Sequence, residues 1–564
     1  MKFEDFQYDR PSIETWKTAF DSKLGDFKNA ENLEVQVKAM DEINVLRNSM
    51  DTMKTLCSIR YTIDSTDEFY TAEQDYFDEI SPLVEEKITE FYKELVTSKF
   101  KTELEVKYGC QLFALAEGQL KTFSPEIIEL LQQENRLTSE YGKLVASAKI
   151  SFDGKELTLS QLGPYRENIN REIRRSSTDT LFSYYSDHLE RFDGIYDQLV
   201  KIRTEIAHKL GYKNYTELGY YRMGRTDYTP KMVANYRKQI VEHVVPLVSR
   251  LYARQKERIG LDDLKFYDEL FKFKSGNAQP QGTPEWIIEN GQKMYEEMST
   301  ETGEFFNFMV EHGLLDLVAK KGKQGGGYCT YLPDFKSPFI FSNFNGTSSD
   351  IDVLTHEVGH AFQCYSSRGY ELPEYGWPTM EACEIHSMSM EFFAWPWMKL
   401  FFKEQADKYF FSHLADGLVF LPYGVLVDHF QHVVYEKPEL TPEERRAEWS
   451  KLEKIYLPER NYDGNAYLSS GGAWQRQSHI YEVPFYYIDY TLAQVCAFQF
   501  WKKMHENREE AWADYVHLCK QGGSQSFLGL VKEAKLISPF EDGCLESVVT
   551  VLEDYLNGIK DKDL

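Results

Sequence analysis

The stretch Thr355-His-Glu-Val-Gly-His360 places two histidines four positions apart, with a glutamate directly after the first. In an α-helix this spacing brings His356 and His360 onto one face, one turn apart, where both imidazoles can bind the same zinc ion. Glu357 is then rotated away from that row and can act as a general base toward a zinc-bound water molecule. On a helix, the stretch therefore predicts a zinc site of the metallopeptidase kind.

The residues around this stretch favour a helix that follows a strand. Ser349 is the expected N-cap, and Asp352, three residues later, would complete a capping box. Before it, the residues from Pro338 to Asn343 form a strand-like run, and Asn345-Gly346 predicts the turn into the helix. The apolar residues that recur at helical spacing, and predict one buried face, are Ile351, Leu354, Val358, Ala361, Phe362 and Tyr365.

A third metal ligand is expected on a following helix, because a catalytic zinc site usually has three protein ligands and leaves its fourth position to water. Spacing alone does not choose among Glu381, Glu384 and His386. The pair His429 and His432, three positions apart, is a weaker candidate for a metal site, since such histidines are more often core or surface residues.

The chain as a whole is predicted to be mainly α-helical. Helical periodicity covers residues 1–146, returns over residues 163–310 and resumes at residue 347, while the Asp153-Gly154 turn predicts a small β-hairpin. No linker separates the halves, so we expect two helical lobes that enclose a deep cleft, with a small β element beside the zinc-binding helix. The predicted division is an N-terminal helical lobe, residues 1–190, and a catalytic helical region, residues 191–564.

The composition argues against several kinds of partner. Asp and Glu outnumber Lys and Arg by 90 to 64, and the formal net charge of −26 repels nucleic acid and anionic lipid. The N-terminus lacks the apolar segment of a secretory signal, and the apolar stretch at residues 414–427 is interrupted by Asp, Gly and Pro. The eight cysteines, Cys364 and Cys383 included, form no CxxC pair and indicate reduced thiols. We therefore expect a cytoplasmic protein that binds neither nucleic acid nor membranes.

Beyond the zinc motif, an ordered set of segments resembles the thimet oligopeptidase and oligoendopeptidase F family of zinc metallopeptidases, and the oligoendopeptidase F branch most closely. The resemblance extends from about residue 198 to about residue 535. The segments that carry it are Leu199–Arg203, Leu210–Tyr215, Gly326–Cys329, Pro338–Ile340, Leu354–Ala361, Glu384–Glu391, Asp428–Tyr435, His479–Tyr486 and Gly522–Ser524.

The resemblance implies the third metal ligand. The family's metal-binding glutamate falls on Glu384, 28 residues after His356, and with His360 these residues would hold one zinc ion per chain. Glu391 and Glu381 then become candidates for orienting a ligating imidazole.

The resemblance also implies donors for the oxyanion of the transition state. They fall most readily on His479 and Tyr490, while a second tyrosine stays open between Tyr481 and Tyr486.

The predicted function is a zinc-dependent endopeptidase that cuts oligopeptides at internal bonds, with Glu357 activating a zinc-bound water molecule. The strand from Pro338 to Asn343 is expected to present an edge that pairs with extended substrate. One alternative is a helical zinc carboxypeptidase, which should carry a cationic pocket for the substrate's C-terminal carboxylate. The other is a peptide-binding protein in which zinc is purely structural. The sequence predicts neither the cleavage-site preference, nor the physiological peptide, nor the oligomeric state.

Overall fold

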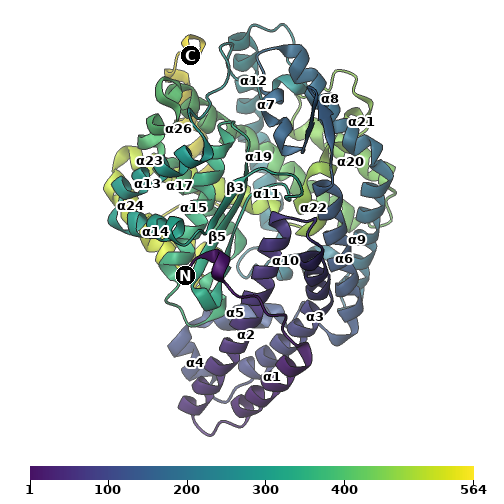
Figure 1. The fold of residues 1–564 in the computed structure, drawn as a ribbon, viewed down its shortest axis with the longest axis vertical. Coiled ribbons are helices and arrows are strands. Elements are labelled where there is room, and N and C mark those ends of the chain that lie inside the picture. Colours follow the sequence, from purple (N-terminus) through teal and green to yellow (C-terminus); the bar gives the residue numbers. More distant parts are fainter.

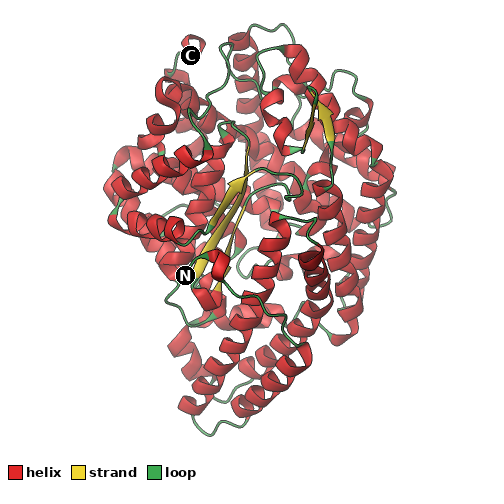
Figure 2. Ribbon diagram, in the orientation of Figure 1, coloured by secondary structure: helices red, strands yellow, loops and turns green.

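The computed structural model describes residues 1–564 and shows a mainly α-helical protein with two small sheets (Figures 1 and 2), which confirms the predicted fold class. The helices before the larger sheet are α1 (Ile13–Lys28), α2 (Leu33–Ile63), α3 (Glu68–Val96), α4 (Lys101–Tyr108), α5 (Cys110–Gln119), α6 (Ile128–Ala146), α7 (Gly163–Arg166), α8 (Arg171–Asp187), α9 (Leu189–Lys209), α10 (Tyr215–Arg222), α11 (Pro230–Gln239), α12 (Val245–Ile259), α13 (Pro284–Met298) and α14 (Thr300–Glu311).

The helices after the larger sheet contain the zinc motif and all the other predicted site residues. They are α15 (Ser349–Ser367), α16 (Pro373–Gly376), α17 (Met380–Phe393), α18 (Met398–Phe402), α19 (Ala406–Glu436), α20 (Pro442–Tyr456), α21 (Ala466–Ser469), α22 (Ser478–Glu482), α23 (Tyr487–Glu506), α24 (Arg508–Gln521), α25 (Phe527–Glu533) and α26 (Cys544–Gly558). In Figure 1, α1, α2 and α4 lie at one end of the molecule and α12 and α26 at the other.

The larger sheet contains β3 (Leu315–Val318), β4 (Tyr328–Leu332) and β5 (Ser337–Phe344) in the order β3-β5-β4. β5 is parallel to β3 and antiparallel to β4, so it is the central strand and its two edges are already paired. The prediction that this strand offers a free edge to substrate was therefore wrong. Seven of its eight residues are buried, as expected for a strand covered on both sides, whereas four of the five β4 residues are half-buried and β4 keeps a free edge.

The smaller sheet is the predicted hairpin of β1 (Ile150–Phe152) and β2 (Lys155–Leu157), which pair antiparallel. Asp153 and Gly154 both have positive φ, 52° and 71°, which is the backbone that a two-residue hairpin turn requires.

The buried apolar residues form two separate cores. The smaller one lies among α1 to α5 and includes Leu372 and Tyr375 from α16 and the residues just before it. The Tyr375 hydroxyl accepts a hydrogen bond from the backbone N–H of Leu112 and donates one to the carbonyl of Tyr108. These contacts anchor the segment that leads into α17 against the N-terminal helices. The predicted division after residue 190 stays a prediction.

The most apolar segment of the chain belongs to the larger core. An 18-residue window between Pro373 and Glu436 has a mean hydropathy of 1.5, but 61% of it is buried inside the molecule. The long helix α19 supplies many residues to the larger core. Its apolar character is therefore accounted for by packing within the protein.

Candidate metal centre and active site

Helix α15 carries the zinc motif, but its start differs from the predicted capping box. The helix begins at Ser349, so the residue at the N-cap position is Ser348, which already has helical dihedrals and makes no capping hydrogen bond. Instead the carboxylate of Asp350 accepts hydrogen bonds from the backbone N–H groups of Asn345 and Gly346 at 2.9 and 2.8 Å. Asp352 accepts one from Tyr409. The capping box was wrong because the turn before the helix folds back onto the first helical turn.

Gly359 in the middle of the motif lets α15 and α17 cross closely. A Cβ atom at this position would lie 2.6 Å from both the carbonyl oxygen of His386 and the Cα atom of Ser387. Non-bonded atoms do not approach so closely, so any larger residue would push the two helices apart. The glycine therefore sets the distance at which α17 presents Glu384 to the histidines of α15.

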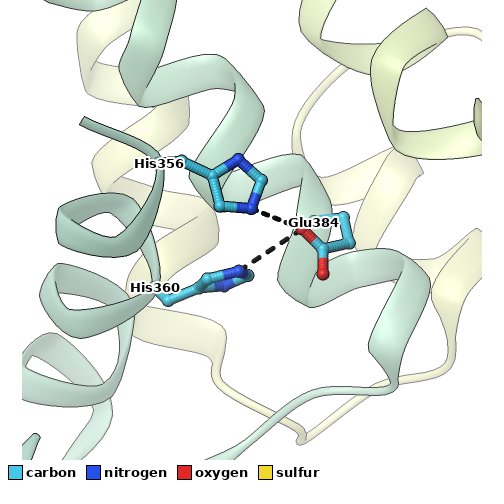
Figure 3. A group of neighbouring side chains, drawn as sticks. All are labelled: His356, His360 and Glu384. Carbon is cyan, nitrogen blue, oxygen red and sulfur yellow. Dashed lines mark ion pairs between the residues drawn. The ribbon is translucent and has the colours of Figure 1, made fainter. Parts of the chain in front are cut away.

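Three ligand atoms converge at this crossing (Figure 3). Oε2 of Glu384 lies 3.1 Å from Nε2 of His356 and 3.3 Å from Nε2 of His360, and all three atoms lie within 4.8 Å of one another. Glu384 is 1% exposed. Of the alternatives left open by spacing, the structure brings Glu384 to the histidines, while Glu381 and His386 are buried without any side-chain hydrogen bond.

The donor set fits a zinc ion. Nδ1 of His356 lies 2.7 Å from a carboxylate oxygen of Glu391, so that nitrogen carries a proton and Nε2 presents a lone pair. Lone pairs of nitrogen and carboxylate oxygen repel one another unless a cation lies between them. Two imidazoles and one carboxylate are a ligand set typical of catalytic zinc, with a position left open for water.

Glu391 connects the metal centre to α19. Its second oxygen lies 2.7 Å from Nε2 of His413, whose Nδ1 in turn accepts a hydrogen bond from the Trp395 indole at 3.0 Å. Burial opposes the charged form of Glu391, but hydrogen bonds from both histidines outweigh it and keep its pKa below the usual range. Of the two predicted orienting residues, Glu391 contacts a ligand and Glu381 does not. His413 and Trp395 carry no local pattern by which the sequence would reveal them.

The carboxylate of Glu384 is itself held by two hydroxyl groups. Ser387 donates to Oε2 at 2.9 Å, and Tyr486 donates to Oε1. Tyr481 lies elsewhere, stacked on Tyr141 with ring centroids 4.0 Å apart. Of the two tyrosines left open, it is Tyr486 that reaches the site.

Glu357 lies between the metal centre and the start of β4. It is 5% exposed, and its Oε2 atom has no hydrogen-bond partner in the protein. A Cβ atom at Gly327, just before β4, would lie 3.3 Å from Glu357 Oε1. Burial raises the pKa of Glu357, although the neighbouring histidines oppose this. A carboxylate with a raised pKa and a free oxygen is suited to take up a proton.

His479 and Tyr490 also come together. Nε2 of His479 lies 3.1 Å from the Tyr490 hydroxyl, and Nδ1 lies 2.7 Å from the amide nitrogen of Gln477, whose oxygen accepts a hydrogen bond from Tyr423 at 2.9 Å. Burial lowers the pKa of His479 to about 4, so the imidazole is neutral at pH 7. With Nδ1 accepting from Gln477, Nε2 carries the proton and is a donor. Gln477 and Tyr423 were not found from the sequence.

The weaker metal candidate does not form a site. His429 contacts Tyr456 at 2.9 Å, whereas His432 contacts Tyr220 at 3.2 Å, so the two imidazoles have different hydrogen-bond partners.

All eight cysteines are unpaired, and Cys364 and Cys383 are buried, as expected.

A cavity of about 370 Å³ opens near the metal centre. Its lining comes both from the N-terminal helices, through Arg47 and Tyr92, and from the region around the site, through Tyr331 of β4, Arg368 and Trp377. The ring of Trp377 lies 6.2 Å from that of His360. The cavity thus lies between the N-terminal helices and the segment that joins α15 to α17, with Trp377 as its lining residue nearest to His360.

A helical scaffold that presents His356 and His360 from one helix and Glu384 from the next is that of an HExxH metallopeptidase. The family models agree. Residues 165–550 match peptidase family M3, and residues 3–123 match the peptidase M3 N-terminal domain. The chain belongs to peptidase family M3.

Similar proteins include both solved structures and curated relatives. The chain is 61% identical to the structure of Pz peptidase A with an inhibitor, over 100% of both chains and with a TM-score of 0.99. It is 23% identical to oligopeptidase PepF of Bacillus subtilis (strain 168), covering 80% of this chain and 71% of that protein. An oligoendopeptidase F homolog of Borreliella burgdorferi is also 23% identical, over 70% of this chain and 69% of the relative.

Proposed function

We propose that this protein is a zinc endopeptidase that hydrolyses internal bonds of short oligopeptides. The observation that carries the proposal is the convergence of His356, His360 and Glu384 beside a buried carboxylate, Glu357, that has a free oxygen. The names of the relatives, an oligopeptidase and an oligoendopeptidase F homolog, support oligopeptides as the substrate class. We also propose a cytoplasmic enzyme without nucleic acid or membrane partners, because a net charge of −26 repels nucleic acid and anionic lipid.

In this proposal each group has one role. One zinc ion, bound by His356, His360 and Glu384, would supply Lewis-acid activation of water and of the scissile carbonyl. Glu357 takes the proton from the attacking water and later delivers it to the leaving nitrogen. The Nε2–H group of His479 and the hydroxyl of Tyr490 donate hydrogen bonds to the oxyanion of the tetrahedral transition state.

The remaining groups hold the machinery in place. Glu391 fixes the orientation of His356, and Tyr486 fixes the carboxylate of Glu384. We further propose that the peptide lies in a cleft between the N-terminal helices and the catalytic region and pairs with the free edge of β4. The cavity lined by residues of both parts, and the free edge beside Glu357, support this arrangement.

The proposal is tested with defined peptides and mass spectrometry of the products. Phenanthroline should abolish cleavage and added zinc should restore it, because the water is not activated without the metal. Full activity in protein freed of metal would contradict the proposal.

Substrate size and end groups test the rest of the proposal. Peptides with amidated C-termini should be cut at internal bonds, whereas the alternative zinc carboxypeptidase requires a free carboxylate. Folded proteins and casein should persist, and rapid digestion of intact casein would contradict a narrow cleft.

A further inference from the structure

The segment that joins α15 to α17 forms one wall of the cavity near the metal centre. It covers residues 368–379 and contains the short helix α16. Trp377, which directly follows α16, is half-buried and lines the cavity, and its ring lies 6.2 Å from that of His360. Part of the indole surface therefore faces free space beside a proposed zinc ligand.

The N-terminal helices hold this segment through a buried ion pair. The Glu374 carboxylate lies 2.7 Å from the Arg47 guanidinium group of α2, and the two side chains are 5% and 10% exposed. The hydroxyl of Tyr92 on α3 donates to the same carboxylate oxygen at 2.5 Å and accepts from Arg47 at 3.0 Å. Burial opposes the charged form of Glu374, but Arg47 and Tyr92 outweigh it and keep its pKa below the usual range.

The catalytic region holds the same segment through backbone atoms. The carbonyl of Gly376 accepts a hydrogen bond from the Ser367 hydroxyl of α15 at 3.1 Å, and the N–H of Gly523 donates to the carbonyl of Tyr375 at 3.0 Å. A Cβ atom at Gly523 would lie 2.3 Å from the carbonyl oxygen of Trp377, so a larger residue would push the segment away. The glycine pair after α24, which the family resemblance includes, thus packs against the cavity wall.

Loss of the ion pair would disturb this wall at a defined point. A guanidinium group without its carboxylate must reach water, because a buried unpaired charge is costly. Arg47 and Glu374 both line the cavity, so the shift takes place in the cavity wall. Glu374 lies within α16 and Trp377 is its C-cap residue, three positions later, so the indole ring moves with the helix.

We propose that Trp377 contacts the peptide substrate beside the metal centre and that Glu374, through its ion pair with Arg47, positions this tryptophan. The inference rests on the proposed peptidase function. An indole ring offers a large contact area to an uncharged part of the peptide. Glu374 and Arg47 neutralise each other, so their effect on the substrate is exerted through the cavity wall.

Peptide affinity of the zinc-loaded Glu357→Gln protein tests the positioning role without cleavage. The probe is a hexapeptide without charged residues, acetylated and amidated at its ends, so it offers no charge to Glu374 or Arg47. Titration calorimetry should show that Trp377→Ala and Glu374→Gln each raise the dissociation constant about tenfold. Zinc content should stay near one per chain, because neither residue is a proposed ligand.

The double variant decides whether the two residues act together. If Glu374 acts only by positioning Trp377, its loss has no effect once the indole ring is absent. Trp377→Ala with Glu374→Gln should therefore bind the probe as weakly as Trp377→Ala alone. Additive losses, about a hundredfold in total, would overturn the positioning role, and so would unchanged affinity in either single variant.

Steady-state kinetics separate positioning from a general loss of structure. In the otherwise wild-type enzyme, Trp377→Ala and Glu374→Gln should raise KM and leave kcat within about twofold, because they remove binding and not chemistry. Glu374→Asp keeps the charge but shortens the side chain, and should show the same pattern to a smaller degree. It replaces Glu374→Gln if that variant does not fold. A fall in kcat without a change in KM would contradict the proposal.

Asp561→Asn is the matched control. Asp561 forms an ion pair with Arg258 of α12, and these side chains are 10% and 5% exposed. Its loss should lower thermal stability but leave the affinity for the probe at the wild-type value. An equal loss of affinity in this control would show that the effect is one of general stability and would overturn the positioning role.

The proposed function fails on a different observation. If the zinc-loaded wild-type protein cleaves no peptide, the peptidase proposal is overturned, whatever the binding data show. If it cleaves peptides but affinity does not depend on Trp377 and Glu374, only the positioning proposal is overturned.

Discussion

Nδ1 of His356 lies 2.7 Å from the carboxylate of Glu391, one helix away. The other oxygen of that carboxylate lies 2.7 Å from Nε2 of His413, so one glutamate connects α15, α17 and α19. Such a contact fixes the tautomer and the ring plane of a ligating imidazole before any metal binds. The proposed metal centre would therefore depend on residues that do not themselves bind the ion.

The first prediction is a graded loss of zinc. Glu384→Ala removes a ligand and should abolish tight binding, because two histidines alone hold zinc poorly. Glu391→Gln keeps all three ligands but places an amide between two imidazoles, and zinc affinity should fall about ten- to a hundredfold. Competition with a chromophoric chelator measures both effects.

Glu381→Gln is the control for this series. Glu381 is a buried carboxyl group on the same helix with no hydrogen-bond partner, and burial raises its pKa to about 8. It is therefore mostly protonated at pH 7, and glutamine resembles that form, so zinc affinity should stay near the wild-type value. A loss as large as that of Glu384→Ala would mean that the wrong ligand has been assigned.

The second prediction concerns the crossing of α15 and α17. Gly359→Ala places a methyl group 2.6 Å from the backbone of α17, so the helices must separate. The protein should lose about 1–3 kcal/mol of stability and bind zinc more weakly. Thermal unfolding with and without zinc measures both. Gly369→Ala is the control, because a Cβ atom there meets nothing within 4 Å. Equal behaviour of the two variants would contradict the close-crossing argument.

Much of the centre could be predicted because its signals are local or are carried by the family resemblance. The HExxH spacing indicates which side chains share a helix face, and the Asp153-Gly154 pair indicates a hairpin turn. Residues 381, 384 and 386 could not be ranked by spacing, because the choice depends on how α17 crosses α15. The resemblance supplied that choice for Glu384.

The predictions that were wrong or missing share a physical cause, because each depends on tertiary contacts and not on the local sequence. The central place of β5 depends on its pairing with β3 and β4, which no property of the β5 segment itself specifies. His413 reaches Glu391 from a position 22 residues away, and Gln477 orients His479 through a hydrogen bond that leaves no periodic pattern. The start of α15 was misplaced by one residue because the preceding turn closes onto Asp350, a tertiary arrangement that competes with capping.

The third prediction concerns acid stability. Burial lowers the pKa of His432, which is 4% exposed, from 6.5 to about 4. Between these values the unfolded chain binds a proton that the folded protein does not, so stability falls as the pH is lowered from about 6.5 to about 4. The slope for one such histidine is about 1.4 kcal/mol per pH unit.

His432→Gln tests this slope. Urea unfolding of metal-free protein at pH 7 and pH 5 should show a smaller loss of stability for the variant than for wild type. An identical pH dependence would show that His432 is not responsible.

The fourth prediction concerns the oxyanion donors. His479→Ala and Tyr490→Phe should each lower turnover but leave measurable activity, because a zinc ion bound by His356, His360 and Glu384 would still supply charge stabilisation for the oxyanion. Peptide affinity and zinc content should be nearly unchanged. Tyr481→Phe is the control, since Tyr481 is a core residue stacked on Tyr141. Wild-type turnover by Tyr490→Phe would remove that hydroxyl from the mechanism.

The last prediction separates metal binding from chemistry. Glu357 is adjacent to His356 in sequence, yet its Oε2 atom has no partner in the protein and its carboxylate is not among the converging ligand atoms. Glu357→Gln keeps the size and shape of the side chain but removes the basic oxygen. Zinc occupancy should therefore remain near one per chain while turnover falls about a hundred- to ten-thousandfold, toward the upper end for a metallopeptidase base. Peptide binding should survive, because the β4 edge and the cavity walls are unchanged. Metal analysis, titration calorimetry and single-turnover kinetics on one preparation measure zinc occupancy, peptide affinity and turnover. If the variant retains more than roughly a tenth of wild-type turnover with zinc bound, Glu357 is not the base, and another carboxylate must take the proton.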